Sequence, residues 1–192
     1  MFVEETESEL LKKAQRGDFN AFAELTEPYR RSACEFLNRL TGEDSSEDVF
    51  MTALLNAWKA LDTFNGRSSY RTWLFSIARF AALDHLRKAK TRNEVSADDE
   101  ESGANISAIG DKTTPPPSRE IENEERSRII DKCLQKLSEP HRAALILYYY
   151  QDFQYSEIAE LLGISIGTVM SRLHHAKAKL EKLLNPYKDD LL

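Results

Sequence analysis

A chain of 192 residues, 41% of them hydrophobic, is long enough to build one or two small domains with a real core. No apolar run could cross a bilayer, and the N-terminus, MFVEETESEL, is acidic and unlike a signal peptide, so we expect a cytoplasmic protein without membrane insertion. The formal net charge of −6 excludes a uniformly basic surface, so any binding to a polyanion must rely on local clusters of charge.

A first helical domain is predicted for residues 1–92. Gly42 should end its first long helical run, since glycine readily adopts the left-handed conformation that closes a helix. The clearest amphipathic helix spans residues 46–64, and three- and four-residue spacings gather its apolar stripe on one face. That stripe consists of Phe50, Ala53, Leu54, Ala57, Trp58 and Leu61. The opposite face should be exposed and should offer either an ordinary solvated surface or a protein-docking strip made of Asp48, Val49, Thr52, Leu55 and Asn56.

The segment that follows, residues 64–92, interleaves aromatic and basic residues. Its Asn65-Gly66 pair should break the preceding helix, and either Ser68 or Ser69 should cap the next one. Some of the aromatic rings, Trp73 in part, belong in the core. Aromatic rings beside a small polar loop, followed by a basic helix, are nevertheless typical of proteins that hold the unstacked bases of a single strand.

Charge is divided sharply along the chain. Residues 67–92 contain seven Lys and Arg against one Asp, a net charge of +6, whereas residues 93–118 contain six Asp and Glu against one Lys, a net charge of −5. The acidic stretch has three consecutive prolines and no aromatic residue, so it cannot bury enough apolar surface to order itself. We therefore interpret residues 93–120 as a flexible acidic linker between two domains.

The second domain, residues 121–192, contains two short helical patterns that meet at Gly163. Ser165 should cap the second helix, whose predicted buried face is made of Ile166, Val169, Leu173, Ala176 and Leu180. Its outward face, GTxxSR followed by two histidines, is small and hydrogen-bonding rather than rich in Glu and Lys. Such a helix-turn-helix can place its second helix in a DNA major groove, although a plain helical hairpin is the alternative.

The ordered set of segments resembles a bacterial RNA polymerase sigma factor of the extracytoplasmic function (ECF) group. Region two of that family resembles GDFNAFAELTEPY, SEDVFMTALLNAWKALDTFNG and YRTWLFSIARFAALDHLRK, and region four resembles LSEPHRAALILYYYQDFQYSEIAELLGISIGTVMSRLHHAKAKL. The resemblance implies an all-α fold of two small helical domains. These are a region-two bundle over residues 1–92 and a region-four helix-turn-helix domain over residues 121–192, joined by the linker.

The resemblance also implies a function without catalysis: binding to the clamp and flap regions of core RNA polymerase, recognition of promoter DNA, and control by an anti-sigma factor. Core polymerase would contact Asp48, Val49, Thr52, Leu55 and Asn56. The −35 duplex would contact Ser165, Gly167, Thr168, Ser171, Arg172, His174, His175 and Lys177. The melted −10 strand would contact Phe64, Asn65, Arg67, Ser68, Tyr70, Arg71, Trp73, Arg79, Phe80, Asp84, Arg87 and Lys88.

Three positions depart from the family pattern. Met51-Thr52 replaces a Gln-Glu pair in the helix that binds the polymerase clamp, Phe80 replaces an Asn in the promoter-melting helix, and Met170 replaces a Lys or Arg in the recognition helix. We expect an altered polymerase contact, an altered −10 preference and the loss of one DNA contact, respectively.

Two other classes of protein would share part of this sequence pattern. A helix-turn-helix repressor or activator that acts without core polymerase would explain the second domain, but not the aromatic and basic segment of the first. A helical enzyme with a DNA-binding tail would need a catalytic constellation, and we find no paired acids in a cleft pattern, no glycine-rich phosphate loop and no metal-ligand spacing. Cys34 and Cys133 form no paired motif, so we expect no metal, cofactor or disulfide.

Overall fold

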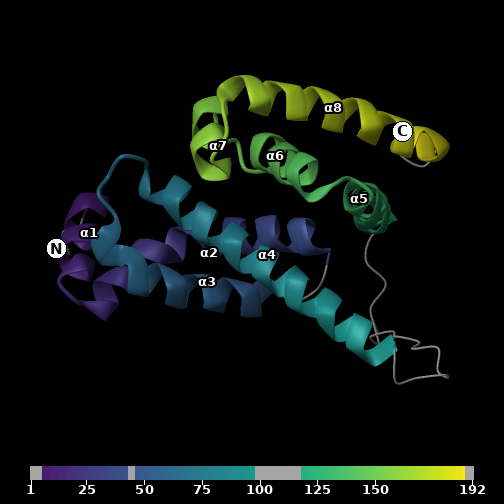
Figure 1. Cartoon of the computed structure of the whole chain (residues 1–192). Helices are drawn as coiled ribbons and strands as arrows, with labels where there is room; N and C mark the ends of the chain where they lie inside the picture. Colours follow the sequence, from purple (N-terminus) through teal and green to yellow (C-terminus); the bar gives the residue numbers. More distant parts are fainter. Residues whose placement is uncertain (1–5, 43–45, 98–117, 189–192) are drawn as a thin grey trace.

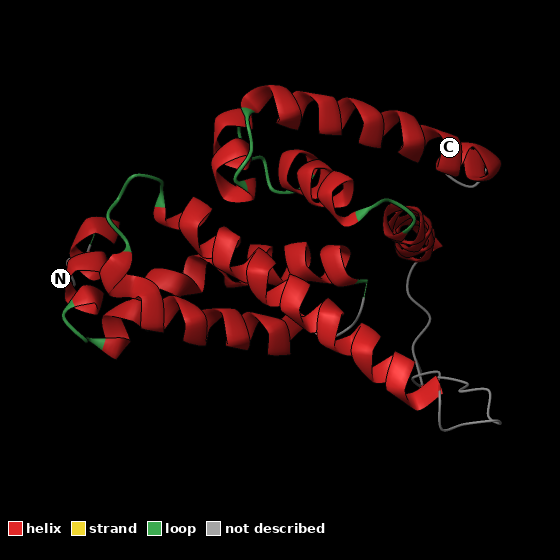
Figure 2. Cartoon of the chain, in the orientation of Figure 1, coloured by secondary structure: helices red, strands yellow, loops and turns green. Residues whose placement is uncertain are grey.

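The computed structural model describes residues 6–42, 46–97 and 118–188, and the regular structure in these ranges is entirely helical (Figures 1 and 2). This confirms the all-α fold class. None of the described helices is long and apolar enough to span a membrane. The elements are α1 Glu7–Gln15, α2 Phe19–Thr41, α3 Ser46–Ala60, η1 Leu61–Thr63, α4 Tyr70–Ala97, α5 Ser118–Gln135, α6 Glu139–Tyr149, α7 Tyr155–Leu162, α8 Ile166–Leu184 and η2 Asn185–Tyr187.

Side-chain caps set where the first helices begin. Thr6 and Glu9 form a capping box before α1, in which the Glu9 carboxylate accepts a hydrogen bond from the Thr6 amide at 3.0 Å. Asp18 caps α2, because its Oδ1 accepts hydrogen bonds from the amides of Asn20 and Ala21 at 3.0 and 3.1 Å. Helices α1 and α2 pack on each other, and α1 lies at one end of the first bundle.

Helix α3 buries the predicted apolar stripe: Phe50, Ala53, Ala57 and Leu61 are buried, and Leu54 and Trp58 are partly buried. The helix ends earlier than expected, because its last turn tightens into the 3₁₀-helix η1 instead of continuing to residue 64. The prediction that Val49 faces outward was wrong. Val49 is only 3% exposed, since the stripe covered by α2 and α4 is wide enough to include the position before Phe50.

Gly42 ends α2 as predicted, in the left-handed region with φ of 72°. A Cβ atom there would lie 2.5 Å from the side-chain amide of Gln135 in α5, so any larger residue would displace that amide. That Gln135 side chain donates a hydrogen bond to the Arg39 carbonyl at 2.7 Å. The end of α2 is therefore shaped to receive a helix from the second half of the chain.

The second set of helices contains the predicted helix-turn-helix, formed by α7 and α8. Gly163 ends α7 with φ of 65°, and the Ser165 hydroxyl caps α8 by accepting a hydrogen bond from the Thr168 amide at 3.1 Å. Val169, Leu173 and Ala176 are buried as predicted, and Leu180 is partly buried. The expectation for Ile166 was wrong. This side chain is 49% exposed, because it is the first residue of α8 and lies ahead of the turns that pack on the domain.

The two sets of helices pack on each other and share one hydrophobic core. Figure 1 shows α6 and α7 lying against α2 and α4, and the contacts between these helices agree. The shared core joins Phe36 and Phe75 of the first set to Phe153 of the second, with ring centroids of Phe75 and Phe153 5.1 Å apart. The Arg39 guanidinium lies 4.3 Å from the ring centroid of Tyr150.

Helices α4 and α5 each extend into residues 93–120, the predicted linker. Helix α4 continues through Ala97, because neither glycine nor proline interrupts residues 93–97, and α5 already begins at Ser118. The rest of the predicted linker, residues 98–117, lies outside the described residues.

Candidate nucleic-acid and polymerase interfaces

The outward face of α8 carries the side chains that the sequence predicted for duplex DNA. Most of that set is exposed, and Thr168 and Arg172 are half-buried; the exposed members are Ser165, Gly167, Ser171, His174, His175 and Lys177. A Cβ atom at Gly167 would meet only the Ser165 hydroxyl, at 3.8 Å, so the interior of the domain does not require a glycine there. The absence of a side chain at Gly167 instead leaves the outer surface of the helix open to close approach.

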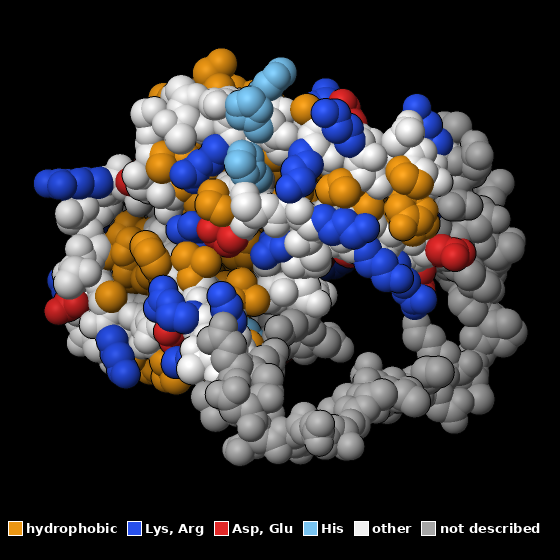
Figure 3. All heavy atoms as spheres, turned by 45° about the vertical axis from the view of Figure 1, so that its right-hand side comes forward, with side chains coloured by type: hydrophobic (Ala, Val, Ile, Leu, Met, Phe, Trp, Pro, Cys, Tyr) orange, Lys and Arg blue, Asp and Glu red, His pale blue; other side chains and the backbone are white. Residues whose placement is uncertain are grey.

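Positive charge gathers around this helix. Helix α8 contains four Lys and Arg (Arg172, Lys177, Lys179, Lys182) and one acid, Glu181, a net charge of +3. The pKa of His141 at the start of α6 is lowered, first by burial and then by the neighbouring positive charges of Arg172, His175 and Lys179. Figure 3 shows histidine side chains beside Lys and Arg side chains on one face of the molecule. This face has the charge that a phosphate backbone requires. The sequence interpretation missed His141 and Lys179.

The loop between η1 and α4 is held in a defined shape. Gly66 takes φ of 73°, and the Asn65 Oδ1 accepts a hydrogen bond from the Arg67 amide at 3.2 Å. Ser69, the second of the two predicted caps, accepts a hydrogen bond from the Thr72 amide at 3.1 Å. Asn65 and Arg67 are exposed, and the small polar loop therefore offers both side chains to an external ligand.

Two aromatic residues of the predicted single-strand set lie inside the protein. Phe64 and Tyr70 are 8% and 2% exposed, so in this structure neither ring is available to a DNA strand, and both belong to the core. They pack around the half-buried Trp73, with ring centroids 5.1 and 5.7 Å from its own, and they support the loop from below. Gln15, which the sequence analysis missed, anchors the start of the loop by donating a hydrogen bond to the Phe64 carbonyl at 2.8 Å.

The basic residues of α4 divide into two groups. Arg87 and Lys88 are exposed, and Lys88 pairs with Asp84 at 2.7 Å, which lowers the pKa of that carboxyl. Arg71 and Arg79 instead face the second set of helices. Arg71 donates a hydrogen bond to the Gln151 carbonyl and lies 4.1 Å from the ring centroid of Phe153. Arg79 donates two hydrogen bonds to the Glu139 carboxylate, at 2.9 and 3.0 Å.

The outer face of α3 keeps four of the five residues predicted for polymerase docking. Asp48, Thr52, Leu55 and Asn56 are exposed, whereas Val49 is not. Met51, which the sequence interpretation named as a departure from the family pattern but not among the five docking residues, is 49% exposed. It lies one turn before Leu55, which is 59% exposed. We call Asp48, Met51, Thr52, Leu55 and Asn56 the docking strip. Its exposed pair of large apolar side chains is suited to a protein partner.

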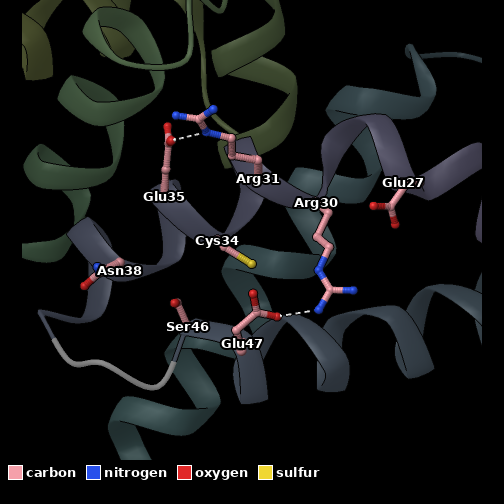
Figure 4. Close-up of a pocket in the computed structure, with 8 residues that line it drawn as sticks. All are labelled: Glu27, Arg30, Arg31, Cys34, Glu35, Asn38, Ser46 and Glu47. Atoms are coloured by element: carbon pink, nitrogen blue, oxygen red, sulfur yellow. Dashed lines mark hydrogen bonds and ion pairs between the residues drawn. The ribbon is translucent and has the colours of Figure 1, made fainter.

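A shallow polar groove runs between α2 and the start of α3 (Figure 4). Arg30 and Glu47 pair across it at 2.9 Å. Burial, followed by the charge of Glu47, raises the pKa of the Cys34 thiol to about 11. This cysteine is therefore protonated at neutral pH and is a poor nucleophile or metal ligand. Within the described parts of the chain, no three His, Cys, Asp or Glu residues lie close enough to hold a metal ion.

A second groove, between α5, α6 and α8, is mostly apolar. Tyr149, 53% exposed, lies at its edge, and Lys177 and Glu181 place one charge of each sign beside it. Its apolar lining is formed by Ile130, Leu145, Tyr149, Tyr150, Leu180 and Leu184. A groove of this kind fits the apolar side of a short helical segment.

Known proteins match the whole arrangement. Family models for Sigma-70 region 2 and Sigma-70 region 4 match residues 25–92 and 127–180. The RNA polymerase sigma-H factor of Pseudomonas aeruginosa is 30% identical over 190 residues, which cover 97% of each chain. The ECF RNA polymerase sigma-E factor of Escherichia coli is 28% identical over 187 residues, covering 94% of this chain and 95% of the relative.

Solved structures give the same result. The sigma factor RpoE from Bartonella quintana, crystallised in complex with the anti-sigma factor NepR, matches with a TM-score of 0.65 and 27% identity, over 85% of this chain and 96% of the other. CnrH, in complex with the cytosolic domain of CnrY, shares the fold with a TM-score of 0.68 at 22% identity, over 95% of this chain and 99% of the other. The chain belongs to the sigma-70 family, as a sigma factor of the ECF group.

Proposed function

We propose that this sigma factor directs promoter-specific initiation by core RNA polymerase through three separate surfaces: α8, the loop with α4, and the docking strip of α3. The observation that carries the proposal is the exposed, basic and small-sided face of α8, in a chain that belongs to the ECF group. The factor makes no bonds itself, since polymerase performs the chemistry.

The first surface reads the −35 element as duplex DNA. Gly167 and Ser171 allow the α8 backbone to approach base edges, and Arg172 is long enough to reach a phosphate or a guanine from the flank. Lys179 adds positive charge toward the phosphates beside the groove, and neutral His141 beside it can donate or accept a hydrogen bond.

The second surface captures the −10 element as a melted strand. Asn65 and Arg67 extend from the loop, and Phe80, 62% exposed, offers a free aromatic ring on α4 for stacking with a base. Exposed Arg87 and Lys88 would follow the phosphates of the same strand. Phe64 and Tyr70 shape the loop without contacting DNA.

Arg71 and Arg79 require a change of arrangement before they can contact DNA. Both guanidinium groups are occupied by Gln151, Phe153 or Glu139 of the second set of helices. Their use on the −10 strand therefore requires α4 to separate from α6 and α7. Polymerase would supply that separation by binding the two domains at distant sites.

We expect this chain to bind two kinds of protein partner. Core polymerase would bind the docking strip through its clamp and the apolar groove between α5, α6 and α8 through its flap. An anti-sigma factor would restrain the free protein in the cytoplasm, a proposal supported by the solved RpoE complex with NepR.

Gel-shift binding to promoter duplexes, with and without core polymerase, tests the proposed function against a repressor or activator that acts alone. We expect tight, sequence-dependent binding only when core polymerase is present. Equal sequence-specific binding by the chain alone, unchanged on adding core polymerase, would refute the proposal.

A further inference from the structure

The recognition helix presents two large apolar side chains where DNA would approach. Ile166 is 49% and Met170 is 54% exposed, although large apolar side chains such as these are usually buried. They lie one turn apart on α8, and side chains at i and i+4 are neighbours on a helix surface. A single exposed apolar residue is ordinary, but two that are neighbours on the exposed end of a helix form a patch of the kind that marks a contact surface.

The pair forms one row of a patterned face. Rows of residues four apart run along α8: Ile166 and Met170 make an apolar row, and Gly167 and Ser171 make a small row directly beside it. Thr168 lies on the far side of the small row. An apolar ridge next to a hydrogen-bonding strip can recognise a surface in which apolar and polar features alternate at short range.

The floor of the DNA major groove is such a surface. Most of its base-edge features are hydrogen-bond donors and acceptors, and its apolar feature is the C5 methyl group of thymine. The net charge of +3 on α8 and the positive cluster around His141 favour a polyanion over an apolar protein surface as the occupant of this face. The apolar ridge lies within that basic face.

We propose that Ile166 and Met170 make this factor read thymine methyl groups in the −35 element. The proposal rests on the proposed placement of α8 in the major groove. The two Cβ atoms of an i, i+4 pair lie about 5–6 Å apart, so the two thymines recognised are about one to two base steps from each other, on either strand. The family pattern has a Lys or Arg at this position, and Met170 replaces that charged contact with an apolar contact to a specific base.

The test uses deoxyuridine, which differs from thymidine only by the missing methyl group. Holoenzyme made with this chain is first used to select a −35 sequence from a randomised promoter library. Each thymine in the selected element is then replaced by deoxyuridine, and binding is measured with the wild type, Ile166→Ala, Met170→Ala and Met170→Leu. Both sites are exposed, so the variants should fold, and thermal unfolding checks this.

With the wild type, one or two deoxyuridine substitutions should weaken binding about fourfold each, the effect of removing one buried methyl group. Ile166→Ala and Met170→Ala should each abolish the effect at one of these positions, and Met170→Leu should retain it. Equal affinity for thymine and deoxyuridine templates at every position would overturn the proposal, as would a methyl effect that persists in both Ala variants.

A different experimental result would contradict the proposed function. If replacing Thr168, Ser171 and Arg172 by Ala leaves −35 binding intact, α8 does not read the element at all. If that triple variant loses binding while deoxyuridine is tolerated, α8 reads the element and only the methyl inference is wrong. Loss of core-polymerase or anti-sigma binding in the Ile166 and Met170 variants, with deoxyuridine tolerated, would assign the pair to a protein contact and overturn the inference.

Discussion

Arg79 of α4 and Glu139, the first residue of α6, form an ion pair with two hydrogen bonds, of 2.9 and 3.0 Å, between residues 60 positions apart in sequence. The two side chains are only 12% and 19% exposed, so solvent screens the pair weakly. Because the pair joins the first set of helices to the second, it stabilises the arrangement in which the two sets are packed together and the Arg79 guanidinium is occupied.

Glu139→Gln should loosen this arrangement while keeping the size of the side chain. The variant leaves the Arg79 charge partly buried without a carboxylate, and we expect a loss of roughly 1–3 kcal/mol in the free energy of unfolding. A larger radius of gyration in small-angle X-ray scattering should accompany the loss. Glu47→Gln, which removes an exposed pair with Arg30, should change neither quantity. Identical behaviour of the two variants would show that the Arg79–Glu139 pair contributes nothing to closure.

Phe153→Ala tests whether the two domains share one core. Phe153 is fully buried between Phe75 and the Arg71 guanidinium, so the truncation should cost about 3–5 kcal/mol, measured by urea unfolding. Phe80→Ala, on the exposed face of α4, should cost less than about 0.5 kcal/mol. Similar small losses in both variants would mean that the domains are apart in solution.

The stability of the free protein should decrease as the pH falls below about 6.5, in part because of His141. Burial and the nearby positive charges lower the pKa of His141 in the folded chain, so the unfolded chain binds its proton more readily. Protonation therefore favours unfolding in the window from about 6.5 down to the lowered folded value. Urea unfolding at pH 7.5 and 5.5 should show a smaller pH dependence for His141→Gln than for the wild type. An equal pH dependence of the unfolding free energy in the two proteins would show that His141 does not contribute to it.

Leu55→Asp should abolish binding to core polymerase, because it places a charge at the centre of the docking strip. Pull-down with core polymerase measures the effect, and circular dichroism checks that the variant is folded. Lys12→Asp, an exposed change on α1, is the matched control and should bind normally. Normal binding by Leu55→Asp would show that the strip faces only solvent.

Arg172→Ala should weaken holoenzyme binding to its promoter and, if the contact is to phosphate, reduce the slope of log affinity against log salt by about one. Arg31→Ala, on α2, removes an arginine whose side chain is 92% exposed and should leave the slope unchanged. A slope unaffected by Arg172→Ala, with unchanged affinity, would remove this residue from the interface.

Local features of this fold could be read from the sequence, because they depend on residues close together in the chain. The caps at Ser69 and Ser165 and the helix ends at Gly42 and Gly163 are decided within one turn, and all four are present in the structure. The buried stripe of α3 followed from helical spacing in the same way.

The burial of a side chain by segments distant in the sequence could not be predicted from the sequence. An aromatic residue beside a polar loop has the same local pattern whether its ring faces solvent or core, and Tyr29 of α2 helps to decide this for Tyr70. The partners of Arg71 and Arg79 are 80 and 60 residues away, on helices whose packing no local pattern encodes. Their sequestration is therefore visible only in the folded chain.

Run-off transcription on a promoter library, with core polymerase and this chain, tests the central claim most directly. We predict products from a restricted set of promoters that share a −35 and a −10 element, and no such products from core polymerase alone. Arg172→Ala and Leu55→Asp should both reduce these products, the first through DNA and the second through polymerase. The absence of any promoter-specific product, from a folded chain that binds duplex DNA on its own, would contradict the assignment.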